Sequence, residues 1–268
     1  MYETTYRRPT SIDEAVKLLR ESDGEGKLMS GGMTLIPTMK ARLAMPSALI
    51  DLRHIEDLKG ISFENGRLRI GGGTTHAETK ASETVRQNAP TFSYLAGLIG
   101  DPAVRHMGTV GGAVANHDPA ADYPAALLAM GATIHTNTRE IAADDFFTGM
   151  FETALEENEI VTAVSFEPPQ AAGWEKFRNP ASRYAMAGVF VAKRADGTVG
   201  VGVTGAGNNG VFRWTAAEEA LSSSFDASAL DGLSISPDDM MGDMHGSAGY
   251  RANLVKVVTK RAVNAAKG

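Results

Sequence analysis

Hydrophobic and polar residues alternate along the chain with two different periods, and together these predict a mixed α and β protein. Apolar residues recur at helical spacing after Ser11, which forms a capping-box pattern with Glu14. Thr75 and Glu78 repeat that pattern at the start of another helix. Helices are therefore expected at 12–19, 34–43, 92–99, 125–130, 216–221, 230–233 and 250–266, with a further helix starting at Thr75.

Short apolar runs bounded by turn residues predict the strands. Asn65-Gly66 is a preferred two-residue hairpin turn, and Ala195-Asp196-Gly197 predicts a second hairpin. The expected strands are 27–29, 48–52, 61–63, 68–70, 132–135, 160–166, 174–177, 185–193 and 199–204.

Two stretches interrupt these patterns and suggest how the chain is organised. Residues 100–124 show little regular periodicity, and a structureless stretch of that length inside a domain is usually functional. Residues 168–173 are rich in proline and small side chains, as in a linker. The expected layout is an α+β domain up to residue 168, followed over 174–268 by a smaller α+β domain with a three-stranded antiparallel sheet.

Charge and composition narrow the functional classes. The chain has 26 Lys and Arg against 32 Asp and Glu, a net charge of -6, and no nucleic-acid partner is expected because such proteins usually carry a basic excess. It has no cysteine, which excludes disulfides, thiolate zinc and any iron–sulfur cluster held by its own residues. No run is apolar enough for a transmembrane segment, and residues 1–9 do not read as a signal peptide, so a cytoplasmic protein is expected.

Glycine makes up 29 of the 268 residues, roughly 11%, which exceeds the usual share of about 7%. Two glycine-containing loops could bind phosphate through backbone amides, namely 30–34 and 109–112. Each loop alone fits a simple turn better than a phosphate site, whereas the two together suggest a split pyrophosphate cradle. Asp122 could accept hydrogen bonds from ligand hydroxyls or cap the helix that follows it.

Other motifs carry less chemistry. Residues 205–210 fit G-x-G-x-x-G, but the preceding strand belongs to an antiparallel hairpin rather than a βαβ unit, so a glycine-rich exit from a sheet is the better interpretation. The histidines lack zinc-site spacing, so no metal site is expected, and His117-Asp118 fits loop capping better than an acid–base pair. No hydrolase elbow or ATPase phosphate loop is present.

Several segments, spread over nearly the whole chain, resemble the FAD-binding medium subunits of molybdenum hydroxylases, of the carbon monoxide dehydrogenase and xanthine dehydrogenase type. The segments that match are 6–9, 11–15, 30–40, 101–102, 107–112, 118–119, 175–178, 184–185, 250–251 and 261–263, together with Arg105, Asn116, Asp122 and Pro124.

The resemblance implies a fold and a cofactor. Residues 1–168 would form a FAD-binding domain of the vanillyl-alcohol-oxidase (PCMH) type, with subdomains of about 1–54 and 55–168, and 174–268 would be the C-terminal domain of such flavoproteins. FAD would be bound non-covalently and would carry the redox chemistry, with no catalytic side chain. The implied FAD-binding residues are Ser30, Gly31, Gly32, Met33, Thr34, Leu35, Ile99, Gly100, Thr109, Val110, Gly111, Gly112, Ala113, Asn116, Asp122, Ile160 and Tyr184.

Each of these residues has an implied place along the cofactor. The loops 31–34 and 109–112 would hold the pyrophosphate, Asp122 the ribityl chain and Ile160 the adenine, while Ile99, Gly100 and Tyr184 would approach the flavin ring. The sequence departs from the family pattern at Ser30, Met33, Thr34, Ala113 and Arg183. Met33 and Ala113 each remove a polar side chain but leave the backbone amides in place.

The resemblance also implies partners. A large subunit would hold the molybdenum cofactor and a small subunit two 2Fe–2S clusters, assembled as a dimer of heterotrimers in the cytoplasm or at the inner face of the membrane. The absence of cysteine agrees with clusters held elsewhere. Two alternatives stay open: a stand-alone flavin oxidase of the same fold, and a scaffold subunit that has lost its flavin.

Overall fold

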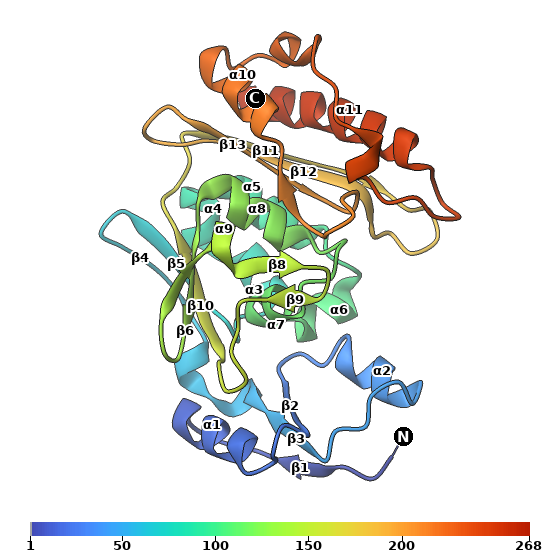
Figure 1. Ribbon diagram of the computed structural model, residues 1–268. Helices are drawn as coiled ribbons and strands as arrows, with labels where there is room; N and C mark the ends of the chain where they lie inside the picture. Colours follow the sequence, from blue (N-terminus) through green and yellow to red (C-terminus); the bar gives the residue numbers. More distant parts are fainter. Residues whose placement is uncertain (1) are drawn as a thin grey trace.

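The computed structural model describes residues 2–268, and its three larger sheets follow one another along the molecule (Figure 1). The first sheet is parallel, with strand order β1-β3-β2, and helix α1 packs against it. Its elements are β1 (Thr5–Arg7), α1 (Ile12–Arg20), β2 (Gly26–Met29), α2 (Leu35–Lys40) and β3 (Ala48–Asp51), followed by the 3₁₀ turns η1 (Leu52–His54) and η2 (Glu56–Leu58).

The second sheet is antiparallel, with order β4-β5-β10-β6-β7, and short helices pack beside it. Its strands are β4 (Ile61–Glu64), β5 (Arg67–Gly71), β6 (Thr133–Thr136), β7 (Glu140–Ala142) and β10 (Val161–Phe166). The other elements are α3 (His76–Ala81), α4 (Glu83–Asn88), α5 (Pro90–Gly97), α6 (Pro102–Met107), α7 (Val110–Asn116), α8 (Asp122–Met130), α9 (Ala143–Phe146), β8 (Phe147–Gly149) and β9 (Glu152–Thr153).

The third sheet is antiparallel and lies between helices on both faces (Figure 1). Its strands are β11 (Ala171–Arg178), β12 (Ala185–Lys193), β13 (Val199–Thr204) and β14 (Phe212–Arg213). Helix α8 packs on one face and α11 (Ala248–Lys267) on the other, with α10 (Thr215–Ser223) beside α11. The short turns η3 (Ala227–Leu230) and η4 (Pro237–Asp239) connect α10 to α11.

Glycines let these helices approach the third sheet closely. A Cβ added at Gly202 of β13 would lie 2.0 Å from the carbonyl oxygen of Ala125 in α8. A Cβ at Gly173 of β11 would lie 1.8 Å from the carbonyl oxygen of Ala262 in α11. The backbones of the helices therefore touch the sheet, and no side chain fits between them.

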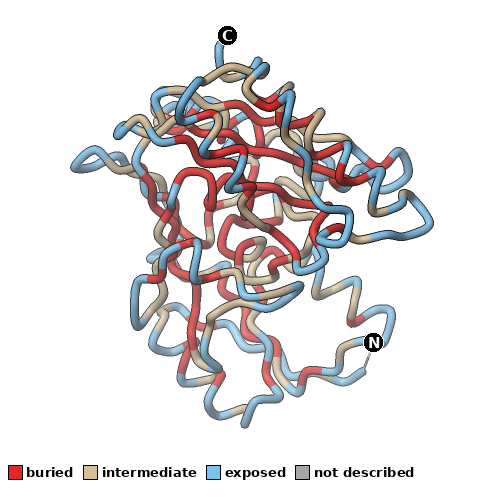
Figure 2. Tube along the Cα trace, turned by 45° about the horizontal axis from the view of Figure 1, so that its top comes forward, coloured by how far each residue is buried: buried red, intermediate tan, exposed pale blue. Residues whose placement is uncertain are grey.

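The main hydrophobic core is continuous between the second and third sheets (Figure 2). It joins aromatic side chains from both layers, including Phe92, Tyr123, Phe166, Trp174 and Phe190. A second core lies between the third sheet and α11, and a smaller one lies under α1. Each sheet is nonetheless drawn from one continuous range of the chain, and the division at about 168–174 stays a prediction.

Several local predictions are confirmed. Asn65 and Gly66 form the turn between β4 and β5, both with positive φ. The hydroxyl of Thr75 and the carboxylate of Glu78 form the reciprocal bonds of a capping box. At α1 only half of that pattern is present, because the Glu14 carboxylate accepts from the amide of Thr10 instead of Ser11.

The structure corrects the prediction for 100–124. This stretch contains two short helices, α6 and α7, whose first turns are capped by the side chains of Asp101 and Thr109. The glycines at 108, 111 and 112 have poor helix propensity, so tertiary packing rather than local sequence makes this segment helical.

Two further corrections concern the third sheet. It has a fourth strand, β14, whose two residues are too short to give a periodic signal. The expected linker 168–173 runs directly into β11, which begins at Ala171 because small residues there pair with the end of β12. The segment 205–210 leaves β13 and leads to β14 rather than to a helix, as expected for a sheet exit.

None of the helices within residues 2–268 combines the length and the apolar composition needed to cross a membrane.

The contact between α8 and β13 gives a test of the packing. We expect Gly202→Ala to lower the free energy of unfolding by about 2–3 kcal/mol, because the added methyl group meets the backbone of Ala125. The matched control is Gly249→Ala, where a Cβ meets nothing within 4 Å and stability should be unchanged or slightly higher. Urea unfolding monitored by circular dichroism measures both; equal stability of the two variants would contradict the close packing.

Candidate functional site

The two glycine-containing loops meet, although 79 residues separate the hydroxyls that join them. Ser30 Oγ lies 2.8 Å from Thr109 Oγ1, within hydrogen-bonding distance. A Cβ added at Gly31 would lie 2.1 Å from the carbonyl oxygen of Met107, so the two backbones are in contact. The fold thus brings 30–34 and 109–112 together, and their role as a pyrophosphate cradle stays a prediction.

The first loop, residues 30–34, offers unused backbone donors. Gly32 has a φ of +70°, which turns the chain from β2 toward α2. The amides of Gly32, Met33 and Thr34 have no hydrogen-bond acceptor among residues 2–268. Met33 is partly exposed, so this row of N–H groups lies at the surface, where an anion could accept from it.

The second loop, extended here to residues 107–112, is held in place by residues 72–76, a segment that the sequence analysis did not assign to the site. Its amides at Val110 and Gly111 donate to the carbonyl oxygens of Thr74 (3.0 Å) and Gly72 (2.8 Å). A Cβ at Gly111 would lie 2.7 Å from the Cα of Gly72, and a Cβ at Gly72 would lie 2.3 Å from the carbonyl oxygen of Val161, so both positions need glycine. The sequence signal was the run of three glycines at 71–73 directly after a predicted strand.

His76 contacts the second loop through its backbone and its ring. Its amide donates to the carbonyl oxygen of Gly108 (3.0 Å), and its ring packs against Tyr123 with centroids 5.3 Å apart. Burial, followed by the positive charge of Arg105, lowers the pKa of His76 to about 4. The imidazole is therefore neutral at pH 7 and acts as a packing group. A Cβ at Gly108 would lie 2.6 Å from its Nε2 atom.

Asp122 forms a buried ion pair with Lys176 of the third sheet. The Lys176 Nζ atom lies 2.8 Å from Asp122 Oδ2, and both side chains are almost wholly buried. Burial raises the pKa of Asp122, while the Lys176 ammonium opposes that shift. Ala121 is the N-cap of α8, so the alternative reading of Asp122 as a helix cap is wrong.

The second carboxylate oxygen of Asp122, Oδ1, is buried and has no hydrogen-bond partner within residues 2–268. Buried carboxylate oxygens normally accept a hydrogen bond, so the missing partner suggests that this oxygen accepts from a ligand. The sequence alone assigns no role to Lys176, because a single lysine in a strand pattern gives no signal of its burial.

Tyr184 lies near this carboxylate. Partial burial, together with the negative charges of Asp118 and Asp122, raises the pKa of Tyr184. The phenol ring is 54% exposed and lines a cavity of about 360 Å³. Pro119 and Ala120, on the segment that leads to α8, line the same cavity.

Ile99 and Gly100 form a turn just before α6. Arg105 holds this turn, because its Nη1 atom donates to the carbonyl oxygens of Ile99 (2.9 Å) and Gly100 (3.0 Å). The remaining predicted residues lie on the two short helices that follow the loops. Leu35 is the first residue of α2, and Val110, Ala113 and Asn116 belong to α7.

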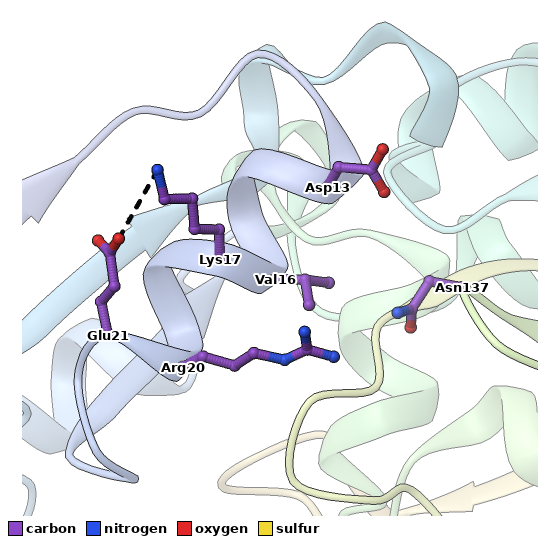
Figure 3. Close-up of a pocket in the computed structure, with 6 residues that line it drawn as sticks. All are labelled: Asp13, Val16, Lys17, Arg20, Glu21 and Asn137. Carbon is purple, nitrogen blue, oxygen red and sulfur yellow. Dashed lines mark ion pairs between the residues drawn. The ribbon is translucent and has the colours of Figure 1, made fainter.

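Ile160 lies apart from the loops. Its side chain is buried in the core under α1, and its amide donates to Asn137 Oδ1 (2.7 Å). Asn137 also lines an open crevice beside α1, with Arg20 and Val16 on the opposite wall (Figure 3). Both acidic and basic side chains line the crevice, and Lys17 and Glu21 form an ion pair at its edge (Figure 3).

The loops offer neutral amides and hydroxyls, and Asp122 of α8 offers one buried carboxylate oxygen. This set suits a ligand that combines phosphate groups with hydroxyls, since amides and hydroxyls donate to phosphate and the carboxylate accepts from a hydroxyl. Within the described part of the chain no three His, Asp or Glu residues are grouped to hold a metal ion.

Comparison with known proteins identifies the family. Residues 2–169 match the family model described as the FAD binding domain in molybdopterin dehydrogenase. The carbon monoxide dehydrogenase medium chain of Afipia carboxidovorans is 35% identical over 98% of this chain and 96% of its own length. The nicotine 6-hydroxylase medium subunit of Paenarthrobacter nicotinovorans is 32% identical, with 96% and 95% covered.

A solved structure of the Cu,Mo-CO dehydrogenase, in a cyanide-inactivated form, superposes with a TM-score of 0.90 at 35% identity. The match covers 98% of this chain and 97% of the other, so the likeness includes the third sheet as well as the loops. The α+β fold expected from the resemblance is confirmed. The chain therefore belongs to the family of FAD-binding medium subunits of molybdenum hydroxylases.

Proposed function

We propose that this chain binds FAD non-covalently and carries electrons from the 2Fe–2S clusters of a partner subunit to an external acceptor. The observation that carries the proposal is the meeting of the two loops through Ser30 and Thr109, inside the range that matches the FAD-binding family. The flavin supplies the redox chemistry when bound, and the protein binds and orients it.

The residues of the site divide between the parts of the cofactor. The free amides of 32–34 and the hydroxyl of Thr109 would hold the pyrophosphate. Ile99, Gly100 and Tyr184 would line the flavin ring, and Ile160 would lie toward the adenine. Ile160 supports this least, because its side chain is in the core and its amide is already bonded.

Asp122 would bind a ribityl hydroxyl through its free Oδ1 atom. Lys176 has a positioning role here, since its ion pair fixes the carboxylate and keeps the other oxygen occupied. A buried carboxylate without such a partner would take up a proton and lose acceptor strength. The pair also ties the third sheet to the site, because Lys176 belongs to β11 and Asp122 to α8.

The absence of cysteine supports the proposal for the partner subunits. The chain contains none, so thiolate-bound clusters must belong to another polypeptide. We propose a small subunit with two 2Fe–2S clusters and a large subunit with the molybdenum cofactor, assembled in the cytoplasm as a dimer of heterotrimers. Substrate would be oxidised at the molybdenum centre, and the substrate is therefore chosen by the large subunit.

The purified full chain should be yellow and should release FAD on denaturation. A colourless preparation that cannot be reconstituted with FAD would instead support a scaffold subunit without flavin. Substrate turnover by the isolated chain would support a stand-alone flavin oxidase. Flavin absorbance and assays with artificial electron acceptors measure both outcomes.

Gly31 gives a test of the loop contact. We expect Gly31→Val to abolish FAD binding, because its side chain would meet the Met107 carbonyl and force the loops apart. Gly232→Ala is the control, since a Cβ there meets nothing within 4 Å. Flavin content per protein, measured by absorbance, should fall only in the first variant. A normal flavin content in Gly31→Val, with the fold intact by circular dichroism, argues against the pyrophosphate site.

Lys176 gives a test of the buried pair. We expect Lys176→Met to cost about 3 kcal/mol of stability and to weaken FAD binding, because Asp122 is left buried without its partner. Lys59→Met is the matched control: it removes an exposed ion pair with Glu56 and should change stability by less than about 1 kcal/mol. Urea unfolding and flavin titration measure the two effects. Similar stability of both variants would show that the ion pair between Lys176 and Asp122 does not stabilise the fold.

A further inference from the structure

The hydroxyl pair of Ser30 and Thr109 is the sole hydrogen bond that joins the first loop to the second within residues 2–268. The second loop is tied to residues 72–76 by three backbone hydrogen bonds, which makes it the fixed member of the pair. The first loop contacts it at Ser30 and at the Gly31 backbone. The Ser30 hydroxyl therefore adds a directional bond to the Gly31 packing and helps to set the register of 30–34 against 107–112.

The hydroxyl pair of Ser30 and Thr109 also leaves one hydrogen free to donate to a ligand. Two hydroxyls carry two hydrogens, and their mutual bond uses one of them, whichever oxygen donates. Thr109 Oγ1 accepts in addition from the amide of Gly112 at 3.1 Å. Neither hydroxyl has another acceptor in the part of the chain that the structure describes. One hydroxyl hydrogen is thus left over at the junction of the loops.

The backbone donors are distributed unevenly between the loops. The amides of Val110, Gly111 and Gly112 are bonded within the protein. The amides of Gly32, Met33 and Thr34 are free. An anion at this junction would meet backbone donors from the first loop and the spare hydroxyl hydrogen from the pair.

We propose that Ser30 is a positioning residue that makes the site selective for a diphosphate-linked flavin over a flavin monophosphate. Two linked phosphoryl groups can reach both the amides of the first loop and the hydroxyl pair, and they gain from the register that Ser30 helps to set. A single phosphoryl group can be bound by the first loop alone and gains nothing from that register. The inference rests on the proposed FAD binding and assigns the source of its selectivity.

The test compares three ligands on the full chain after removal of its flavin. Flavin fluorescence measures the Kd of FAD and FMN, and calorimetry measures the Kd of ADP, which has the diphosphate without the flavin. We expect Ser30→Ala to raise the Kd of FAD and of ADP by roughly tenfold, the usual effect of losing one such hydrogen bond. The Kd of FMN should not change.

Ser30→Thr is the rescue variant, because it keeps a hydroxyl at the same position; it should restore tight binding of FAD and ADP. The thermal midpoint of each variant without ligand checks that the loops stay folded. Unchanged FAD binding in Ser30→Ala, an equal loss for FAD and FMN, or no rescue by threonine would each overturn the inference. Failure of the wild-type chain to bind FAD would overturn the proposed function instead, so the two failures are distinguishable.

Discussion

The close approach of two backbones at Gly31 and Met107 is the constraint on which the site depends. A side chain at position 31 would occupy the space of the Met107 carbonyl group, so the two loops can meet only if this residue is glycine. The same need recurs one layer away, where Gly111 lies against Gly72. Two backbones approach this closely only where a side chain is absent, and the glycines provide that space.

Helix α8 connects this site to the rest of the molecule. Its first residue, Asp122, is the carboxylate that we propose to bind the ligand, and its body packs against the glycines of β13. The ion pair between Asp122 and Lys176 crosses from α8 to β11, and the aromatic core continues along the same boundary. The third sheet therefore does more than cover the site. It supplies the ammonium that pairs with the buried carboxylate of Asp122, and Tyr184 lies on the loop between its strands β11 and β12.

The two loops offer neutral groups, which suits an acidic protein. A net charge of -6 disfavours phosphate at long range, and the free amides and the hydroxyl pair of the loops offset this. The departures from the family pattern at Met33 and Ala113 leave that set intact, because the donors are in the backbone. The additional hydroxyl at Ser30 gives the two loops a contact that does not depend on the ligand.

The sequence alone determined much of this. Helical and alternating patterns located most elements, Asn65-Gly66 defined a hairpin, and the two glycine motifs named the loops that the fold brings together. The absence of cysteine indicated that iron–sulfur clusters belong to other chains. These features are local or compositional, so periodicity and residue type are enough to reveal them.

Only the tertiary structure decided the rest. The helices α6 and α7 form in a glycine-rich stretch because packing outweighs propensity, and β14 is held by its neighbour rather than by its own two residues. The burial of Lys176 against Asp122 and the bonding of Ser30 to Thr109 join residues far apart in the chain. A charge or hydroxyl in the sequence does not reveal its partner, because its environment is created by segments that meet only when the chain folds.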